Sequence, residues 1–276
     1  MTPISHHPVS REAMAAALVA MLGLINGPLL AAAAPPVAVL TPEEIARLLE
    51  EGAGVLKQGM PEVALTKYFE PVNQSFMRQT AKAGADDEIY ASHGATEAAA
   101  YAAKVAKRNE SANTQLRMVT VDGAWTDALV LKARALVELK RTGDAISAVD
   151  QATIISPAYP SPWNELGSIY QNEKDWEKSQ GAYRSAENVA GAVDDKALQT
   201  QMLTTALRGQ AFALTELGRL DESEALYKRC LKINPGDSAA AEGLSHISER
   251  RAAEAGTSTA PAPVSAPAAP PAPTAH

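Results

Sequence analysis

Apolar residues recur at helical spacing from Thr41 onward, and capping residues mark where the first helices begin. Thr41 can cap a helix, Pro42 suits its first position, and Glu44 completes a capping box. Apolar residues then keep a helical period until Gly59, and Pro61 opens the next helix. The pattern predicts two consecutive helices over residues 41–58 and from residue 61 onward.

Two features interrupt this pattern. Pro71 lies inside the second predicted helix and should bend or stop it. Residues 84–122 predict one strong helix from Ala95 to Arg108, for which Ser92 could serve as N-cap. The β-branched run 119–121 indicates a connector that could add a short extended segment. Trp125 follows, and we expect it to be a packing residue.

The most regular stretch runs from Pro162 to Ala186. From Trp163, large and small residues fall at offsets 0, 3, 4, 7, 16, 20 and 23, which suits two antiparallel helices in close contact at Gly167. The pattern W-x2-L-G-x2-Y resembles the tetratricopeptide repeat, whose period is 34 residues.

The same register extends to both sides of Trp163. Leu129 lies 34 residues before it, and Gly143 is expected to mark the turn between the helices of that earlier unit. The next equivalent residue is Leu207, 44 residues after Trp163, so ten extra residues lie between 189 and 201. Asp194 or Asp195 can cap an early start, which predicts that the following helix is extended by more than two turns.

A terminal helix is predicted over residues 238–253, capped by Asp237. The pattern places Ala241, Leu244 and Ile247 on its apolar side. The residues expected on its polar side are Glu242, Glu249, Arg250 and Arg251. Solenoids need such a cap to cover their last apolar face. The Ala/Pro-rich residues 256–276 are expected to be disordered, acting as a spacer in preference to a docking peptide.

The resemblance implies an all-α fold, a right-handed TPR-like helical solenoid with a C-terminal capping helix. The expected organisation is a signal peptide (1–33), a linker (34–40), an N-terminal helical region with a degenerate repeat (41–122), the solenoid and capping helix (123–255) and the tail (256–276).

The N-terminal segment has the order of a secretory leader. Arg11 precedes a charge-free apolar run, and Ala31 and Ala33 form an A-x-A pair, which predicts cleavage after Ala33. The alternative is an uncleaved anchor over residues 14–34. We therefore expect export, with a bacterial periplasm as the specific compartment.

Composition restricts the partner and the chemistry. The 276-residue chain is 46% hydrophobic and carries a formal charge of −7, so it lacks the basic footprint of a nucleic-acid-binding protein. Its single cysteine, Cys230, excludes an internal disulfide and is expected to be buried.

Motifs for catalysis are absent from the sequence. It contains no HExxH, G-x-S-x-G, Walker or dinucleotide motif, and its acidic runs lack the spacing of a calcium loop. Only His93, next to Ser92, lies in a stretch that the repeat does not explain, and adjacent residues rarely form a nucleophile–base pair. We expect no enzyme activity, no cofactor and no metal.

The resemblance also implies a concave groove lined by the first helix of each unit. The carboxylate clamp of some family members is absent, because its slots hold Val130, Arg134, Glu165, Thr205 and Gly209. Among the groove slots, the residues predicted to bind a partner are Asp127, Arg134, Glu138, Asn164, Ser168, Gln171, Asn172, Arg208, Phe212 and Glu216.

The sequence therefore predicts a non-catalytic exported repeat protein that binds a protein or peptide, in the cell envelope of a bacterium. Two alternatives remain open at this stage. One is an enzyme or ligand-binding module built on residues 84–122, and the other is a structural subunit of an envelope complex.

Overall fold

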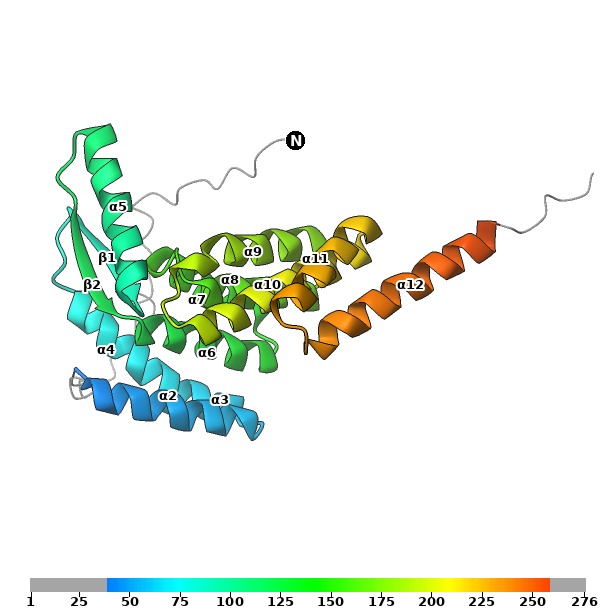
Figure 1. The fold of residues 1–276 in the computed structure, drawn as a ribbon. Coiled ribbons are helices and arrows are strands. Elements are labelled where there is room, and N and C mark those ends of the chain that lie inside the picture. Colours follow the sequence, from blue (N-terminus) through cyan, green and yellow to red (C-terminus); the bar gives the residue numbers. More distant parts are fainter. Residues whose placement is uncertain (1–38, 259–276) are drawn as a thin grey trace, which may run out of the picture. The chain divides into compact units, whose positions relative to one another are not determined.

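The computed structural model describes residues 39–258. The predicted signal peptide, its alternative as an anchor, most of the linker and the tail beyond residue 258 lie outside this range. Within it, no helix has the length and apolar character that crossing a bilayer requires. Helices dominate residues 39–258, in which one pair of strands is present (Figure 1).

The first helices form as the capping residues predict. Helix α2 (Pro42–Lys57) starts at a complete capping box between Thr41 and Glu44, and Gly59 takes a positive φ of 75° just beyond its end. Helix α3 (Pro61–Ala64) then begins at Pro61. The degenerate first repeat therefore has both of its expected helix starts.

Pro71 does not stop the second helix, which was one of the two effects predicted for it, and the backbone instead changes locally just before it. Helix α3 continues through the π-helical turn η1 (Leu65–Phe69) into α4 (Glu70–Thr80), with Pro71 in the first turn of α4. A proline removes one backbone donor and crowds the carbonyl one turn earlier. The wider π turn, in which the Glu70 amide donates to the Leu65 carbonyl, adapts the backbone just before the proline.

Residues 84–122 form a β-α-β unit. Strand β1 (Asp87–Ser92) and strand β2 (Arg117–Asp122) pair in parallel and are joined by helix α5 (Ala95–Ala112). The predicted helix is present and ends four residues later than expected, and the β-branched run lies in β2. Strand β1 was not predicted. Ser92 is its last residue, and Gly94 occupies the N-cap position of α5.

The repeat region consists of successive helix pairs that pack against their neighbours (Figure 1). Their bounds are α6 (Ala124–Glu138), α7 (Thr142–Ile155), α8 (Pro160–Asn172), α9 (Trp176–Val189), the 3-10 turn η2 (Ala190–Ala192), α10 (Lys196–Glu216), α11 (Leu220–Ile233) and α12 (Ser238–Ser258). Helix α10 has 21 residues and α8 has 13, which confirms the predicted extension. Asp195 caps α10 by accepting from the Leu198 amide.

Each turn between paired helices contains one residue in the left-handed backbone conformation. Gly143, which was predicted to mark such a turn, is not one of these residues. Lys140, Lys174 and Gly218 have φ values of 61°, 58° and 74°, just after α6, α8 and α10. Gly143 lies in the first turn of α7. The positive φ comes from the geometry of the tight turn, which lysine adopts here in two units.

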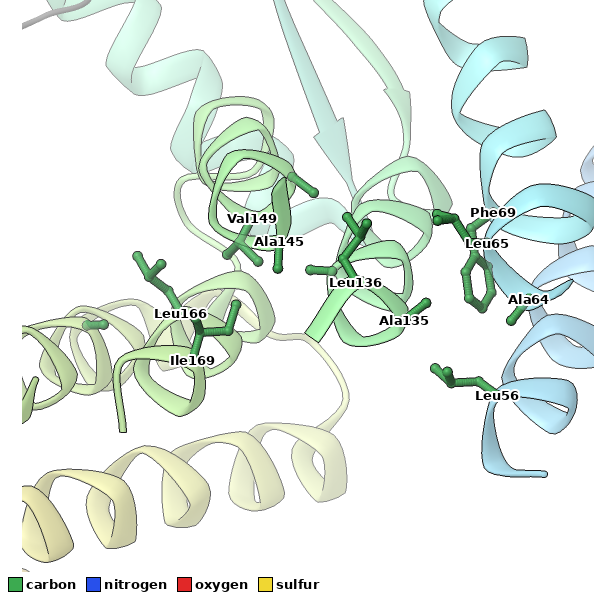
Figure 2. Packing of buried hydrophobic residues seen from close by; sticks show 13 residues of the cluster. Leu56, Ala64, Leu65, Phe69, Ala135, Leu136, Ala145, Val149, Leu166 and Ile169 are labelled. Atoms are coloured by element: carbon green, nitrogen blue, oxygen red, sulfur yellow. The ribbon is translucent and has the colours of Figure 1, made fainter. Parts of the chain in front are cut away.

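One apolar cluster connects the degenerate repeat with the next helices. Figure 2 shows side chains from α2 to η1 facing those of α6, with α7 and α8 on the other side of α6. The labelled members are Leu56, Ala64, Leu65, Phe69, Ala135, Leu136, Ala145, Val149, Leu166 and Ile169. Trp125 is buried in a neighbouring cluster, stacks on Phe76 and donates from Nε1 to Asn73, which agrees with its predicted packing role.

Glycine allows the closest helix contacts. A Cβ atom on Gly167 would lie 2.7 Å from the ring of Tyr183, and one on Gly209 would also overlap that ring. Tyr183 on α9 therefore lies between α8 and α10, and both of these helices need a residue without a side chain at the contact.

The terminal helix faces its neighbours differently from the prediction. Ala240, Leu244 and Ile247 pack into the last apolar cluster, whereas Ala241 is exposed. Arg250 and Arg251 were expected on the solvent side. Arg250 instead donates to the Thr215 carbonyl of α10, and Arg251 pairs with Asp221 and Glu224 of α11. The actual apolar stripe starts one residue earlier because Gly243 must face Tyr227.

Cys230 is fully buried, as predicted, and burial raises the pKa of its thiol to about 11.

Replacing Gly167 by alanine should destabilise the protein by about 1–3 kcal/mol, because the new methyl group overlaps the buried Tyr183 ring. Urea unfolding of the purified chain measures this change. Gly181→Ala is the control: it lies on α9 with open space around it and should stabilise the helix by about 0.5–1 kcal/mol. Equal effects of the two substitutions would contradict the proposed Gly–Tyr constraint.

Candidate functional site

The first helices of the units lie beside one another. Helix α6 packs against both α2 and α8, and α8 packs against α10. Their side chains at the predicted groove slots therefore form one surface. The structure brings four of the ten predicted binding residues together at one point of this surface.

That point is a pocket of about 480 Å³ between α2, α6 and α8. The four predicted residues in its lining are Arg134, Glu138, Ser168 and Asn172. The other lining residues are Ala53, Leu56, Lys57, Leu131, Val137, Glu165 and Ile169. Leu56, Lys57 and Ala53 come from the degenerate repeat, and sequence reasoning did not assign them to the groove.

The pocket combines an apolar floor with a polar rim. Leu56 and Ile169 are buried core residues that also line the pocket. At the rim, the Arg134 Nε donates to the Glu165 Oε2 at 2.7 Å, and the arginine side chain is 51% exposed. This ion pair neutralises the guanidinium of Arg134, one of the residues predicted to bind a partner. Recognition in this pocket therefore depends on apolar contact as much as on charge.

Two other predicted residues hold neighbouring elements together. Asn164 donates from Nδ2 to the Met202 carbonyl at 3.1 Å, which connects α8 to α10. Its Oδ1 is buried, and no hydrogen-bond donor within residues 39–258 reaches it. Arg208 pairs with the almost fully buried Asp237, at the start of α12. Replacing either residue would disturb the packing as well as any ligand contact.

The last predicted residues are spread along the surface. Phe212 is 37% exposed and meets the edge of Trp176, and Glu216 is exposed at the end of α10. Gln171 accepts a long hydrogen bond from the Tyr183 hydroxyl at 3.5 Å. These side chains extend the groove surface toward α10 but do not line the pocket.

Asp127, also predicted for the groove, binds His93 of the β-α-β unit. The His93 Nε2 lies 3.2 Å from the Asp127 Oδ1, and its Nδ1 lies 3.2 Å from the Glu97 Oε2. Glu97 is only 1% exposed and also accepts from the His93 amide and the Tyr101 hydroxyl. The imidazole stacks on Tyr159, with ring centroids 3.7 Å apart.

This arrangement favours a charged imidazole. Desolvation lowers the pKa of His93, but the hydrogen bonds and charges of Asp127 and Glu97 outweigh it and raise the pKa to about 9. Both ring nitrogens have carboxylate partners, and the Ser92 hydroxyl donates to the Gly94 carbonyl. Ser92 and His93 therefore do not form a nucleophile–base pair in this geometry.

The two segments that depart from the repeat register, the β-α-β unit and the ten-residue insertion before α10, contact each other. Asp194, in the ten-residue insertion, accepts from the amide and hydroxyl of Thr96 in the first turn of α5. A carboxylate at this end of a helix is favourable. The contact joins residues that are 98 positions apart, and no sequence pattern indicated it.

Two acidic residues at the start of β1 are paired with arginines. Asp87 bonds to Arg117, and Glu88 bonds to Arg108. Among residues 39–258, no group of three or more histidine, cysteine or acidic side chains is arranged to hold a metal ion.

Comparison with known proteins identifies one segment of the chain. Residues 210–237, which include the last seven residues of α10 and all of α11, match the model of the tetratricopeptide repeat. No curated protein shows significant similarity. Among solved structures, the chain is similar to BtubC (BKLC) from P. vanneervenii, with 15% identity, a TM-score of 0.38, and coverage of 84% of this chain and 97% of that chain.

Because the pKa of His93 is raised from 6.5 to about 9, its ion pairs stabilise the fold fully below pH 6.5 and lose this effect as the pH rises through 9. The difference in unfolding free energy between wild type and His93→Gln should therefore be largest at pH 6 and shrink toward pH 10. Urea unfolding across this range measures it.

His246→Gln, at an exposed position of α12, is the matched control and should show no such trend. If the difference in unfolding free energy between wild type and His93→Gln stays constant or grows with pH, the assigned ion pairs of a charged His93 are contradicted.

Proposed function

We propose that this tetratricopeptide repeat protein binds an extended segment of a partner protein on the surface formed by α2, α6, α8 and α10. The single observation that carries the proposal is the pocket between α2, α6 and α8, which gathers Arg134, Glu138, Ser168 and Asn172 above an apolar floor. Concave sites with an apolar lining and a few polar groups are typical of ligand binding.

The chemistry of the pocket supports a peptide side chain as the ligand. Its volume of about 480 Å³ can hold an aliphatic side chain and the adjoining backbone. Ser168 and Asn172 on α8 offer a hydroxyl and an amide, which can donate to or accept from peptide groups. Lys57 and Glu138 supply opposite charges at the rim, so the partner segment should carry mixed charge.

The proposal includes the absence of catalysis. Both nitrogens of His93 are bonded to carboxylates, which leaves neither one directed at a substrate. This observation favours a binding role for the repeats over an enzyme built on residues 84–122.

The proposal also includes export to the bacterial cell envelope. Its support is the order of the leader, with Arg11, an apolar run and the small-residue pair at Ala31 and Ala33. Mass spectrometry of the protein isolated from the envelope fraction should show a chain that begins at Ala34. A protein that retains residues 1–33 and stays in the cytosol would contradict this part.

Partner binding should depend on two rim residues that have no structural role. Glu138 and Asn172 are exposed, and neither side chain has a hydrogen bond or ion pair within the described part of the chain. Replacing both by arginine should leave stability unchanged and weaken binding by about tenfold or more, because charge and bulk enter the pocket mouth. The measurement is photocrosslinking in envelope extract through a benzophenone residue at position 168.

The control carries the crosslinker at Ile154, which is 49% exposed on α7. A specific partner should crosslink from position 168 only, and the double substitution should remove that product. Identical products from both positions would contradict binding in the pocket.

A further inference from the structure

Strand β2 has one edge without a hydrogen-bond partner. The amide of Arg117 donates to Asp86, and the amide of Gly123 donates to Ser92, so the odd-numbered residues of β2 direct their backbone groups toward β1. The even-numbered residues Met118, Thr120 and Asp122 direct theirs away from it. Within residues 39–258, no group bonds to the backbone N–H or C=O of these three residues.

The open edge has defined limits. At Leu116, the next outward-facing residue, the side chain of Asn109 accepts from the amide at 2.7 Å and donates to the carbonyl at 2.9 Å. At the other end, the Asp122 side chain accepts from the Ala124 amide as α6 begins. At Leu116 the outward-facing backbone groups are therefore hydrogen-bonded by the protein itself. At the next three outward-facing residues of β2 they are open.

Other elements cover part of each face of the strand pair, and the outer edge of β2 remains open. On one face, Met118 packs with Tyr90, Tyr101 and Val105 under α5. On the other face, Val121 packs in the cluster that contains Trp125. Parallel strands covered on both faces normally belong to larger sheets.

The middle of the edge lacks the devices that usually prevent strand pairing. The strand has no proline, and its charged residues, Arg117 and Asp122, lie only at its ends, with Met-Val-Thr-Val between them. Val119 and Val121 are only partly buried, and Thr120 is exposed. A covered, β-branched strand with an open edge is a template for an added strand.

The register of β2 suits a second copy of itself. In an antiparallel arrangement centred on Thr120, the outward-facing residues pair as Thr120 with its equivalent and Met118 with Asp122, and these pairs can exchange backbone hydrogen bonds. Val119 then lies opposite Val121, a favourable β-branched pair, and Arg117 lies opposite Gly123. No like charges face each other in this register.

We propose that two copies of this chain associate through β2, forming a four-stranded sheet in the order β1–β2–β2–β1. The dimer satisfies the backbone groups of Met118, Thr120 and Asp122 in both copies. It uses the β-α-β unit, whereas the proposed partner site lies between α2, α6 and α8, so the two interactions are independent.

The first test is Thr120→Pro, with mass measured by sedimentation equilibrium on the chain from residue 34 onward. Proline removes an N–H that faces away from β1, so the β1–β2 ladder keeps its hydrogen bonds and the dimer loses two. Wild type should be a dimer and this variant a monomer with an unchanged circular dichroism spectrum. A monomeric wild type would overturn the proposal.

The second test places a charge at Thr120, which faces its own equivalent in the proposed dimer. It remains decisive if the proline variant misfolds. Thr120→Lys and Thr120→Glu each place like charges opposite each other and should raise the dimer dissociation constant by about fivefold or more. An equimolar mixture should dimerise again, because lysine then faces glutamate. The controls are Ala252→Lys and Ala252→Glu, at an exposed position of α12. Dimers unaffected by either Thr120 variant, or a mixture that stays as weak as its components, would overturn the proposal.

Discussion

The arrangement of the repeat helices depends on one aromatic ring held between two glycines. Tyr183 is buried, and side-chain atoms at Gly167 or Gly209 would overlap its ring. Because neither α8 nor α10 has a side chain there, both helices approach α9 closely enough to pack against each other as well. Gly52 meets Tyr68 and Phe69 in the same way, and Gly243 meets Tyr227. The close spacing of α8 and α10 therefore follows from the contacts of Tyr183.

The irregular segments complete the repeat array. The β-α-β unit is joined to the start of α6 through His93 and Asp127, and to the loop before α10 through Thr96 and Asp194. Its strand β1 also packs on α6 and α7. The ten-residue insertion thus supplies the carboxylate that the first turn of α5 needs. The two insertions therefore contact each other, and the helices on either side of each insertion still pack together.

The sequence predicted the elements whose signals are local. Capping residues located α2, the 34-residue register located α6 to α9, and the shift at Leu207 predicted the long α10. Strand β1 was missed because its sequence does not alternate between apolar and polar residues. The neighbouring residues Tyr90 and Ala91, whose side chains point to opposite faces of the strand, are both buried. The pocket was only partly predicted: the degenerate repeat had no assigned groove slots, so Leu56 and Lys57 could not be included. Contacts such as His93 with Asp127 depend on tertiary geometry that spacing does not encode.

The structure also explains why charge alone is a poor guide to a groove of this kind. Arg134 bonds to Glu165, and Arg208 bonds to Asp237, so each cation is paired with a carboxylate that lies about one repeat further along the chain. Such pairing arises naturally in a repeat array, because equivalent positions of neighbouring units face each other. It reduces the charge that a ligand can use, while the partly buried apolar side chains of Leu131 and Val137 also line the pocket. Selectivity for a partner should therefore come mainly from the shape of its apolar side chain, with the rim residues setting its orientation.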